Sequence, residues 1–268
     1  KFSNKTDSGL DIGYVVELES DASTSASYID ESSLSISGGF GKIVLGMNDA
    51  AADDYAISAD DIVSADEAPT SSSATIALTT DIELGDGDNN KIAYHLPAMG
   101  GFTAGVSFTD SGAVGSTDTT TFGMNYVIEA AGNTVTIGAA TATTEATTTD
   151  TDSQILGVKV DSGNLSLIAS QTSYEAVDED ISTTGIGVSY KLSNGVVLGA
   201  YTLKSEDDLD AGEEYSKSGV EVQYAIASGL TAYLNVEDYD YKIGTNNDSA
   251  DTVADAGTVS KLTIAASF

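Results

Sequence analysis

Residues 257–268 read GTVSKLTIAASF, a stretch that alternates apolar and polar side chains and ends on an aromatic residue. Leu262, Ile264 and Phe268 fall on one side of an extended strand, whereas Lys261 and Thr263 fall on the other. Because successive side chains of a strand point to opposite faces of the sheet, this pattern predicts a strand with one apolar face. An edge strand of a soluble sandwich would show the same alternation, so the choice depends on the rest of the chain.

The composition excludes several classes of protein. Cysteine is absent, so the chain can form neither disulfides nor thiolate metal sites. All 10 basic residues are lysines, they stand against 42 acidic residues, and the formal net charge of −32 strongly disfavours binding to nucleic acid. The sequence contains no run of about 20 apolar residues, and therefore encodes no transmembrane helix.

The two-residue alternation recurs along the whole chain. It predicts about fourteen strands, near residues 8–19, 28–37, 41–46, 90–96, 102–109, 119–128, 134–143, 153–161, 165–173, 182–191, 196–204, 216–227, 230–241 and 257–268. Tight turns rich in Gly, Asn and Asp alternate with longer acidic loops. Short connections at one end and long ones at the other are typical of an up-and-down barrel in an outer membrane, whereas a Greek-key sandwich or a propeller connects its strands differently. We therefore predict an all-β transmembrane antiparallel barrel that occupies residues 1–268 as a single domain.

Several short stretches resemble the general diffusion porins of α-proteobacteria. They are TDSGL at 6–10, GFGKIVLG at 39–46, YHLP at 94–97 and GFT at 101–103. The terminal Phe268 is similar to the aromatic end of bacterial outer-membrane barrel proteins. The resemblance implies a sixteen-stranded barrel that assembles as a homotrimer in the bacterial outer membrane, with its third outer loop folded into the lumen.

The resemblance also implies a place for each strand. If residues 1–5 are the end of strand two, the predicted strands are strands three to sixteen, and N-terminal strand sequence is missing from this chain. A fourteen-stranded barrel with a frayed start is the alternative, because a barrel cannot leave an open edge in lipid.

The third long loop, residues 47–89, is the candidate constriction. We expect its acids to lie at the narrowest point of the pore: Asp49, Asp53, Asp54, Asp60, Asp61, Asp66 and Glu67. A loop of this length is either functional or disordered, so a mobile acidic surface loop is the alternative.

Six lysines alternate with the apolar residues of their strands, and we expect them to face the lumen: Lys42, Lys91, Lys159, Lys191, Lys204 and Lys261. The alternative for each is a side chain that reaches the membrane interface. The porin family usually places arginines on this wall, and lysine supplies the charge without the planar guanidinium. Few wall cations facing many acids predict a cation-selective pore.

Neither catalysis nor a defined metal site is indicated. His95 is the single histidine, and we expect a pore-wall role for it. Paired acids such as Asp207-Asp208 and Glu213-Glu214 match no EF-hand loop or nonapeptide repeat. We therefore expect no cofactor, and at most weak binding of Ca²⁺ or Mg²⁺ at the outer loops.

These patterns favour a porin through which small hydrophilic solutes and cations diffuse passively. The expected surroundings are outer-membrane lipid and lipopolysaccharide, and two further copies of the chain. Two alternatives stay open at this point. One is a structural or adhesive outer-membrane barrel with a plugged lumen, and the other is a soluble acidic Ca²⁺-binding surface β-protein.

Overall fold

The structure is a computed structural model that describes residues 1–18, 29–64, 84, 89–110, 117–146, 150–244 and 254–266. The chain divides into two compact units, which we describe separately. The first contains Lys1–Ala56, Glu83–Tyr126 and Gly138–Gln154, and the second contains Ile57–Ile82, Val127–Ile137 and Ile155–Phe268. No helix in the described residues is long and apolar enough to cross a membrane.

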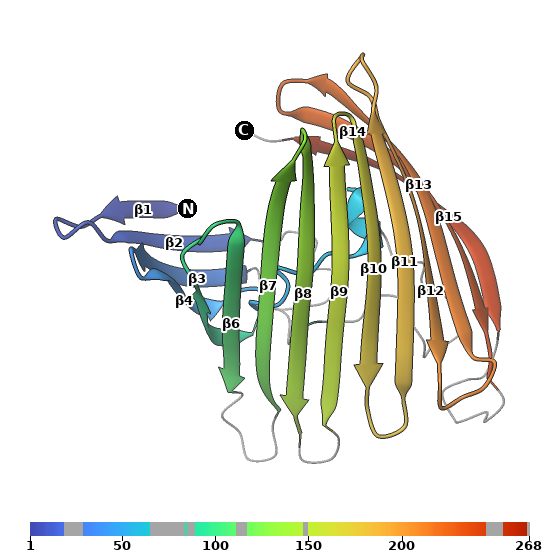
Figure 1. The fold of residues 1–268 in the computed structure, drawn as a ribbon, viewed down its shortest axis with the longest axis horizontal. Coiled ribbons are helices and arrows are strands. Elements are labelled where there is room, and N and C mark those ends of the chain that lie inside the picture. Colours follow the sequence, from blue (N-terminus) through green and yellow to red (C-terminus); the bar gives the residue numbers. More distant parts are fainter. Residues whose placement is uncertain are drawn as a thin grey trace. The chain divides into compact units, whose positions relative to one another are not determined.

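Within those residues, fifteen strands form one antiparallel sheet in the order of the chain (Figure 1). They are β1 (Phe2–Lys5), β2 (Asp11–Leu18), β3 (Ile29–Gly38), β4 (Gly41–Met47), β5 (Asn90–His95), β6 (Phe102–Asp110), β7 (Asp118–Ala130), β8 (Asn133–Glu145), β9 (Thr151–Ser162), β10 (Leu165–Glu175), β11 (Asp180–Lys191), β12 (Val197–Asp207), β13 (Glu214–Ala227), β14 (Leu230–Lys242) and β15 (Asp255–Ala266). Every predicted strand is present, and residues 2–5 add the short β1. The up-and-down all-β fold is therefore confirmed.

The turn between β7 and β8 shows how the sequence builds its hairpins. Only Ala131 and Gly132 separate the two strands, and their φ angles are 52° and 81°. Two successive positive φ values are those of a type I′ turn, whose twist matches that of the flanking strands. Glycine adopts this conformation without steric cost because it lacks a Cβ atom.

The strands of the second unit extend further than predicted. The connection between β10 and β11 is only residues 176–179, and that between β12 and β13 is residues 208–213. The ladder continues because Tyr174 pairs with Ile181 and Glu175 pairs with Asp180. Acidic residues suggested loops here, but in these segments they occupy positions in paired strands.

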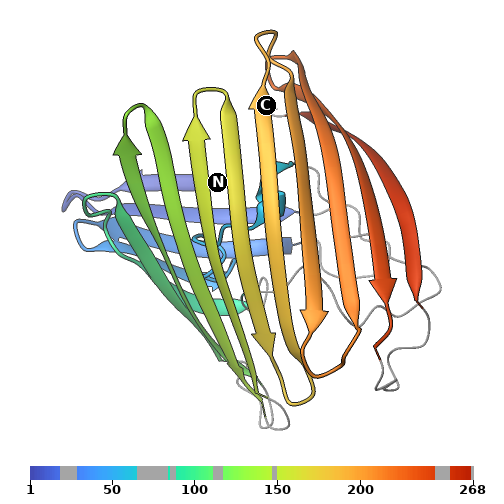
Figure 2. The same cartoon turned by 45° about the vertical axis from the view of Figure 1, so that its right-hand side comes forward.

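The two faces of the sheet have different surroundings. Residues 48–64, which we call the loop segment, contain the 3-10 helix η1 (Ala59–Ile62). We call the face that the loop segment contacts the loop face of each unit. In the second unit β10–β15 run side by side (Figure 2), and their other face exposes large apolar side chains. Ile186, Val220 and Leu262 are 65%, 56% and 69% exposed. A broad apolar surface of this kind marks a face that contacts a membrane or another protein.

Candidate functional site

We call the strands whose loop face the segment contacts the wall. In the first unit, side chains of the wall hold the backbone of the loop segment. The N–H of Ala51 donates to Ser107 Oγ at 3.0 Å, and the N–H of Ala52 donates to Thr121 Oγ1 at 3.2 Å. The two hydroxyl groups lie 2.7 Å apart and share a hydrogen bond. Backbone groups of the strands pair with each other, so a segment that crosses them needs side-chain acceptors for its own N–H groups.

Tyr55 anchors this half of the segment to a cradle of glycines. A Cβ atom added to Gly105 or Gly123 would lie 2.8 Å or 2.7 Å from the Tyr55 ring. The absence of both side chains therefore makes room for the ring, which is only 7% exposed. The Tyr55 hydroxyl lies 3.0 Å from Nδ1 of His95 on β5. Burial first, and the charge of Asp54 second, raise the pKa of Tyr55, so this phenol stays protonated.

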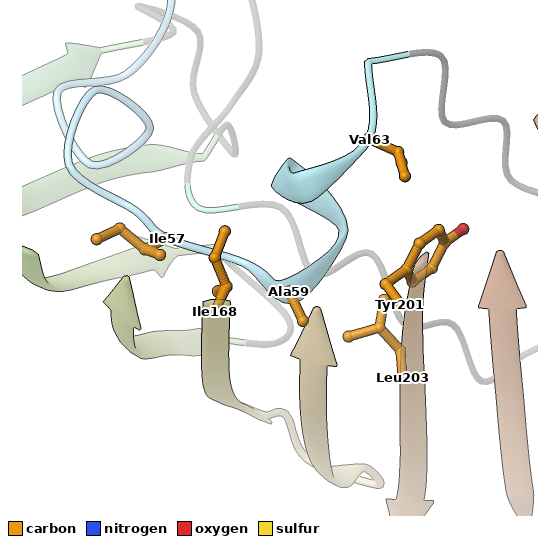
Figure 3. Packing of buried hydrophobic residues seen from close by; sticks show 6 residues of the cluster. All are labelled: Ile57, Ala59, Val63, Ile168, Tyr201 and Leu203. Atoms are coloured by element: carbon orange, nitrogen blue, oxygen red, sulfur yellow. The ribbon is translucent and has the colours of Figure 1, made fainter. Parts of the chain in front are cut away.

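In the second unit, apolar packing holds the loop segment. Three of its side chains form one buried cluster with three side chains of β10 and β12 (Figure 3): Ile57, Ala59 and Val63 with Ile168, Tyr201 and Leu203. The cluster removes apolar surface from water on both the segment and the wall, and this burial stabilises their contact.

Glycines of the wall let the segment approach this closely. A Cβ atom on Gly157 would lie 2.1 Å from the carbonyl oxygen of Ile57. One on Gly187 would lie 2.2 Å from the carbonyl oxygen of Ala59. Both clashes involve backbone atoms, so any larger residue at either position must displace the segment.

Two further N–H groups of the segment donate to wall side chains of the second unit. The Ala59 N–H donates to Ser170 Oγ at 3.0 Å. The Ser64 N–H lies 3.1 Å from both carboxylate oxygens of Glu221 on β13. Both oxygens of the Glu221 carboxyl group lie within hydrogen-bond distance of this N–H, so Glu221 holds the end of the described segment.

Glu221 shares the loop face with a buried polar network. The Tyr201 hydroxyl donates to Glu237 Oε1 at 2.7 Å, and Asn235 Nδ2 donates to the same oxygen at 3.1 Å. The ammonium of Lys217 lies 5.7 Å from the centre of the Tyr201 ring. All four side chains are less than 5% exposed, so the wall beside the segment is polar yet sealed from solvent.

The acids of the segment lie on its other side. Asp49, Asp53, Asp54 and Asp61 are exposed, whereas Asp60 is buried and accepts a hydrogen bond from the Ser58 hydroxyl. The segment is therefore amphipathic in each unit, with apolar side chains on the wall and carboxylates in solvent. The other two predicted acids, Asp66 and Glu67, lie outside the described residues.

Asp53 has the most perturbed carboxyl group of the segment. Partial burial, followed by the neighbouring charge of Asp49, raises its pKa from 3.8 to about 6. Its carboxyl group therefore gains and loses a proton just below neutral pH. Its side chain is exposed to solvent, so this change of charge alters the electrostatic interaction with dissolved ions.

The sequence profile of the Gram-negative porin family matches residues 1–252. The chain belongs to the Gram-negative porin family. No curated protein sequence matches this porin.

Solved porin structures share the fold. The anion-selective porin from Comamonas acidovorans is 17% identical, with a TM-score of 0.67 over 99% of this chain and 87% of that chain. OmpF of Salmonella typhi, in complex with daunomycin, is 15% identical, with a TM-score of 0.64 over 98% and 88%. A third structure, a porin refined at 1.8 Å resolution, is 21% identical, with a TM-score of 0.63 over 97% and 90%.

Membership of this family places the porin in the outer membrane as a β-barrel channel. It also separates the porin from enzymes and from soluble acidic β-proteins. Among the described residues, no group of three or more His, Asp or Glu side chains is arranged to hold a metal ion. Weak binding of Ca²⁺ or Mg²⁺ at the outer loops stays a prediction.

Five of the six lysines from the sequence lie on the loop face. Lys91 is 5% exposed and donates to the carbonyl of Asn48. Lys42 pairs directly with His95 across β4 and β5. Lys159 lies on the same side of β9 as Gly157, and Lys191 lies on the same side of β11 as Gly187. Lys261 pairs with Asn235, which is buried on the loop face.

Lys204 lies on the opposite face, which corrects the expectation from its sequence parity. Tyr201 and Leu203, the apolar residues of β12 that seemed to point outward, are buried against the loop segment instead. Lys204 therefore points away from the segment, where its ammonium contacts Glu206 and lies 3.4 Å from Glu214. The expectation that apolar side chains point away from the loop face does not hold for these residues of β12, because the loop segment gives the loop face of this strand an apolar partner.

Sequence reasoning missed the wall residues that hold the segment. Ser107, Thr121, Ser170 and Glu221 are scattered over four strands, and each looks like an ordinary polar position. The one available signal was the row of glycines on β6, β7, β9 and β11, which marks close approach of another backbone or ring.

Proposed function

We propose that this porin forms a water-filled diffusion pore that prefers cations, and that the loop segment is its constriction. The observation that carries this proposal is the orientation of the segment: Asp49, Asp53, Asp54 and Asp61 are exposed, while its apolar residues are buried on the wall. Carboxylates in a confined aqueous space raise the local concentration of cations and exclude anions.

The positive charges of the wall offer little opposition. Lys91 is buried and engaged by a backbone carbonyl, Lys159 lies 3.9 Å from Asp161, and Lys204 points away. Lys42, Lys191 and Lys261 remain as cations on the loop face, and Lys42 lines the same pocket of about 400 Å³ as Asp49 and Asp54. The net sign of the charges around this pocket therefore supports cation preference.

The similar porin from Comamonas acidovorans is anion-selective by its name. At 17% identity it shares the fold of this chain, and the fold does not determine selectivity. The sign of selectivity depends on the side chains that face the water, which differ freely between such distant relatives.

Further features are part of the proposal. The short motifs TDSGL and GFGKIVLG support membership of the α-proteobacterial group, and the solved structure of OmpT of Vibrio cholerae in a trimer form supports a homotrimer. The exposed apolar face supports contact with outer-membrane lipid, and the acidic loops support bridging of divalent cations to lipopolysaccharide.

Planar-bilayer recordings test the function. In a KCl gradient, we expect discrete conductance steps and a reversal potential of the sign that K⁺ permeation gives. The double variant Asp53→Asn, Asp54→Asn should shift that potential toward zero, whereas Asp178→Asn, an exposed acid between β10 and β11, should not. Anion selectivity of the wild type would contradict the proposal. An absence of steps from folded protein would favour the plugged, adhesive barrel instead.

A further inference from the structure

The single histidine of the porin has two competing partners at one ring nitrogen. Nδ1 of His95 lies 3.0 Å from the Tyr55 hydroxyl and 3.5 Å from Asp54 Oδ2. The imidazole is only 13% exposed, while the Asp54 side chain is 57% exposed. Tyr55 and Asp54 are adjacent in the loop segment, so the proton on Nδ1 decides which of two neighbouring residues His95 binds.

The two partners favour opposite states of that nitrogen, because only the carboxylate is restricted to accepting. A phenol hydroxyl can donate to the lone pair of a neutral imidazole, whereas a carboxylate can only accept. The pKa of the Tyr55 phenol is raised, so its proton is retained for this donation. When Nδ1 is protonated it must donate, and the carboxylate of Asp54 then becomes the stronger partner because both groups are charged.

We propose that His95 is a positioning residue of the pore, which holds Tyr55 when neutral and captures the Asp54 carboxylate when protonated. Protonation adds one positive charge to His95, and the ion pair that forms neutralises one exposed negative charge of the constriction. This inference rests on the proposed function, because the charge of Asp54 matters to ions only in a conducting pore.

The surroundings of His95 define the other charges that act on it. Lys42 faces it from β4, and the Asp54 carboxylate approaches it from the loop segment. Its partner on β6 is Gly105, which brings no side chain, and Lys91 follows on the same side of β5. Further charged groups line the adjoining pocket or lie beside Asp54 in the segment: Lys1, Glu17, Glu31, Asp49 and Asp53.

The first experiment reads the imidazole directly. Because His95 is the one histidine of the chain, porin labelled with ¹⁵N-histidine gives a single pair of ring resonances in detergent micelles. At neutral pH we expect the tautomer with the proton on Nε2 and a free lone pair on Nδ1. Tyr55→Phe should weaken this preference while it keeps the ring in the glycine cradle.

Tyr94→Phe is the matched control, because Tyr94 is the neighbour of His95 and its hydroxyl donates to the Phe40 carbonyl instead. Its histidine spectrum should equal that of the wild type. A proton on Nδ1 at neutral pH, or an unchanged tautomer in Tyr55→Phe, would overturn the proposal.

The second experiment measures selectivity against pH in the Asp53→Asn background, which removes the other carboxyl group that titrates nearby. Between about pH 7.5 and about pH 5, the range in which imidazoles titrate, the cation-to-anion permeability ratio should fall roughly twofold. His95→Asn supplies an acceptor near the position of Nδ1 that does not titrate, so the variant should lose the response. Asp54→Asn should also lose it.

The outcomes separate this inference from the proposed function. If no variant conducts, the proposed function fails, and the tautomer measurement still decides the contact between Tyr55 and His95. If the wild type is a cation-selective pore but His95→Asn keeps the full pH response, the role of His95 is wrong and the proposed function stands.

Discussion

The ring of Tyr201 lies against the backbone of Gly219, its direct partner on β13. A Cβ atom on Gly219 would come within 2.3 Å of Tyr201 Cε1. The glycine therefore allows the ring to lie along the wall, where its hydroxyl reaches Glu237 on β14 and its face meets Lys217.

Gly219→Ala should displace this ring and separate Tyr201 from Glu237. The buried carboxylate would lose a donor, so we expect a loss of about 1–3 kcal/mol in the free energy of unfolding. Denaturant titration in micelles measures it. Gly39→Ala is the matched control, since nothing lies within 4 Å of a Cβ atom there. Equal stability of the two variants would contradict the packing described for Tyr201.

Gly157→Ala should move the loop segment away from the wall. The new methyl group would clash with the carbonyl oxygen of Ile57, which cannot rotate aside as a side-chain end can. Overpacking of this kind typically costs about 1–3 kcal/mol, and the single-channel conductance should change while the strands stay folded. Bilayer recording and circular dichroism together check this, with Gly39→Ala again as the reference. A wild-type conductance would show that the segment does not set the pore size.

The charge of Asp53 should make selectivity depend on pH. Its pKa of about 6 means that the carboxylate forms as the pH rises through 6, so cation preference should increase over that range. Asp53→Asn should lack this contribution and keep only the smaller response that we assign to His95. Reversal potentials at a series of pH values measure it, and a step of equal size in the variant would contradict the assignment.

The same pKa has a consequence for stability with a defined sign. Because the pKa of Asp53 is raised on folding, its protonated form favours the folded state. That contribution is complete below pH 3.8 and is lost as the pH rises through about 6. Wild-type porin should therefore lose stability relative to Asp53→Asn across this window, which thermal unfolding at each pH can follow.

Removal of the charge of Lys91 and of Lys204 should have different effects on the ion selectivity of the pore. Lys91→Met removes a cation that lowers the pKa of Asp53, so the titration of Asp53 should move to higher pH and the cation preference above it should rise. Lys204→Met removes a cation from the opposite face and should leave selectivity unchanged. If Lys204→Met altered the reversal potential as strongly as Lys91→Met, the corrected orientation of β12 would be wrong.

The fold was accessible from the sequence because it depends on a local signal repeated many times. Strands such as β7 and β13 keep a strict two-residue alternation along most of their length. Tight turns such as Ala131-Gly132 are recognisable because glycine adopts a positive φ without steric cost. Strand ends were less predictable. Acidic residues near Glu206 suggested a loop, but β12 continues to Asp207. A strand can include acidic residues where one of its faces is exposed to solvent.

The site was accessible only in part, because its contacts join residues that are distant in sequence. The acids Asp49 to Asp61 were found by their position in a long loop. The parity argument predicted one common face for six lysines; five share the loop face and Lys204 does not, because the argument assumed that apolar side chains always face lipid. The pairing of Tyr55 with His95 had no local signal, since 40 residues separate them.

The hydrogen bonds that the backbone N–H groups of Ala51, Ala52, Ala59 and Ser64 make with the wall leave the loop segment free to change its side chains during evolution. Because the wall grips main-chain N–H groups, these contacts do not depend on which side chains the segment carries toward the water. Substitutions can therefore change the charges at Asp49, Asp53, Asp54 and Asp61 while these hydrogen bonds are kept. Descendants of this chain could change which ions they admit without first having to refold the loop.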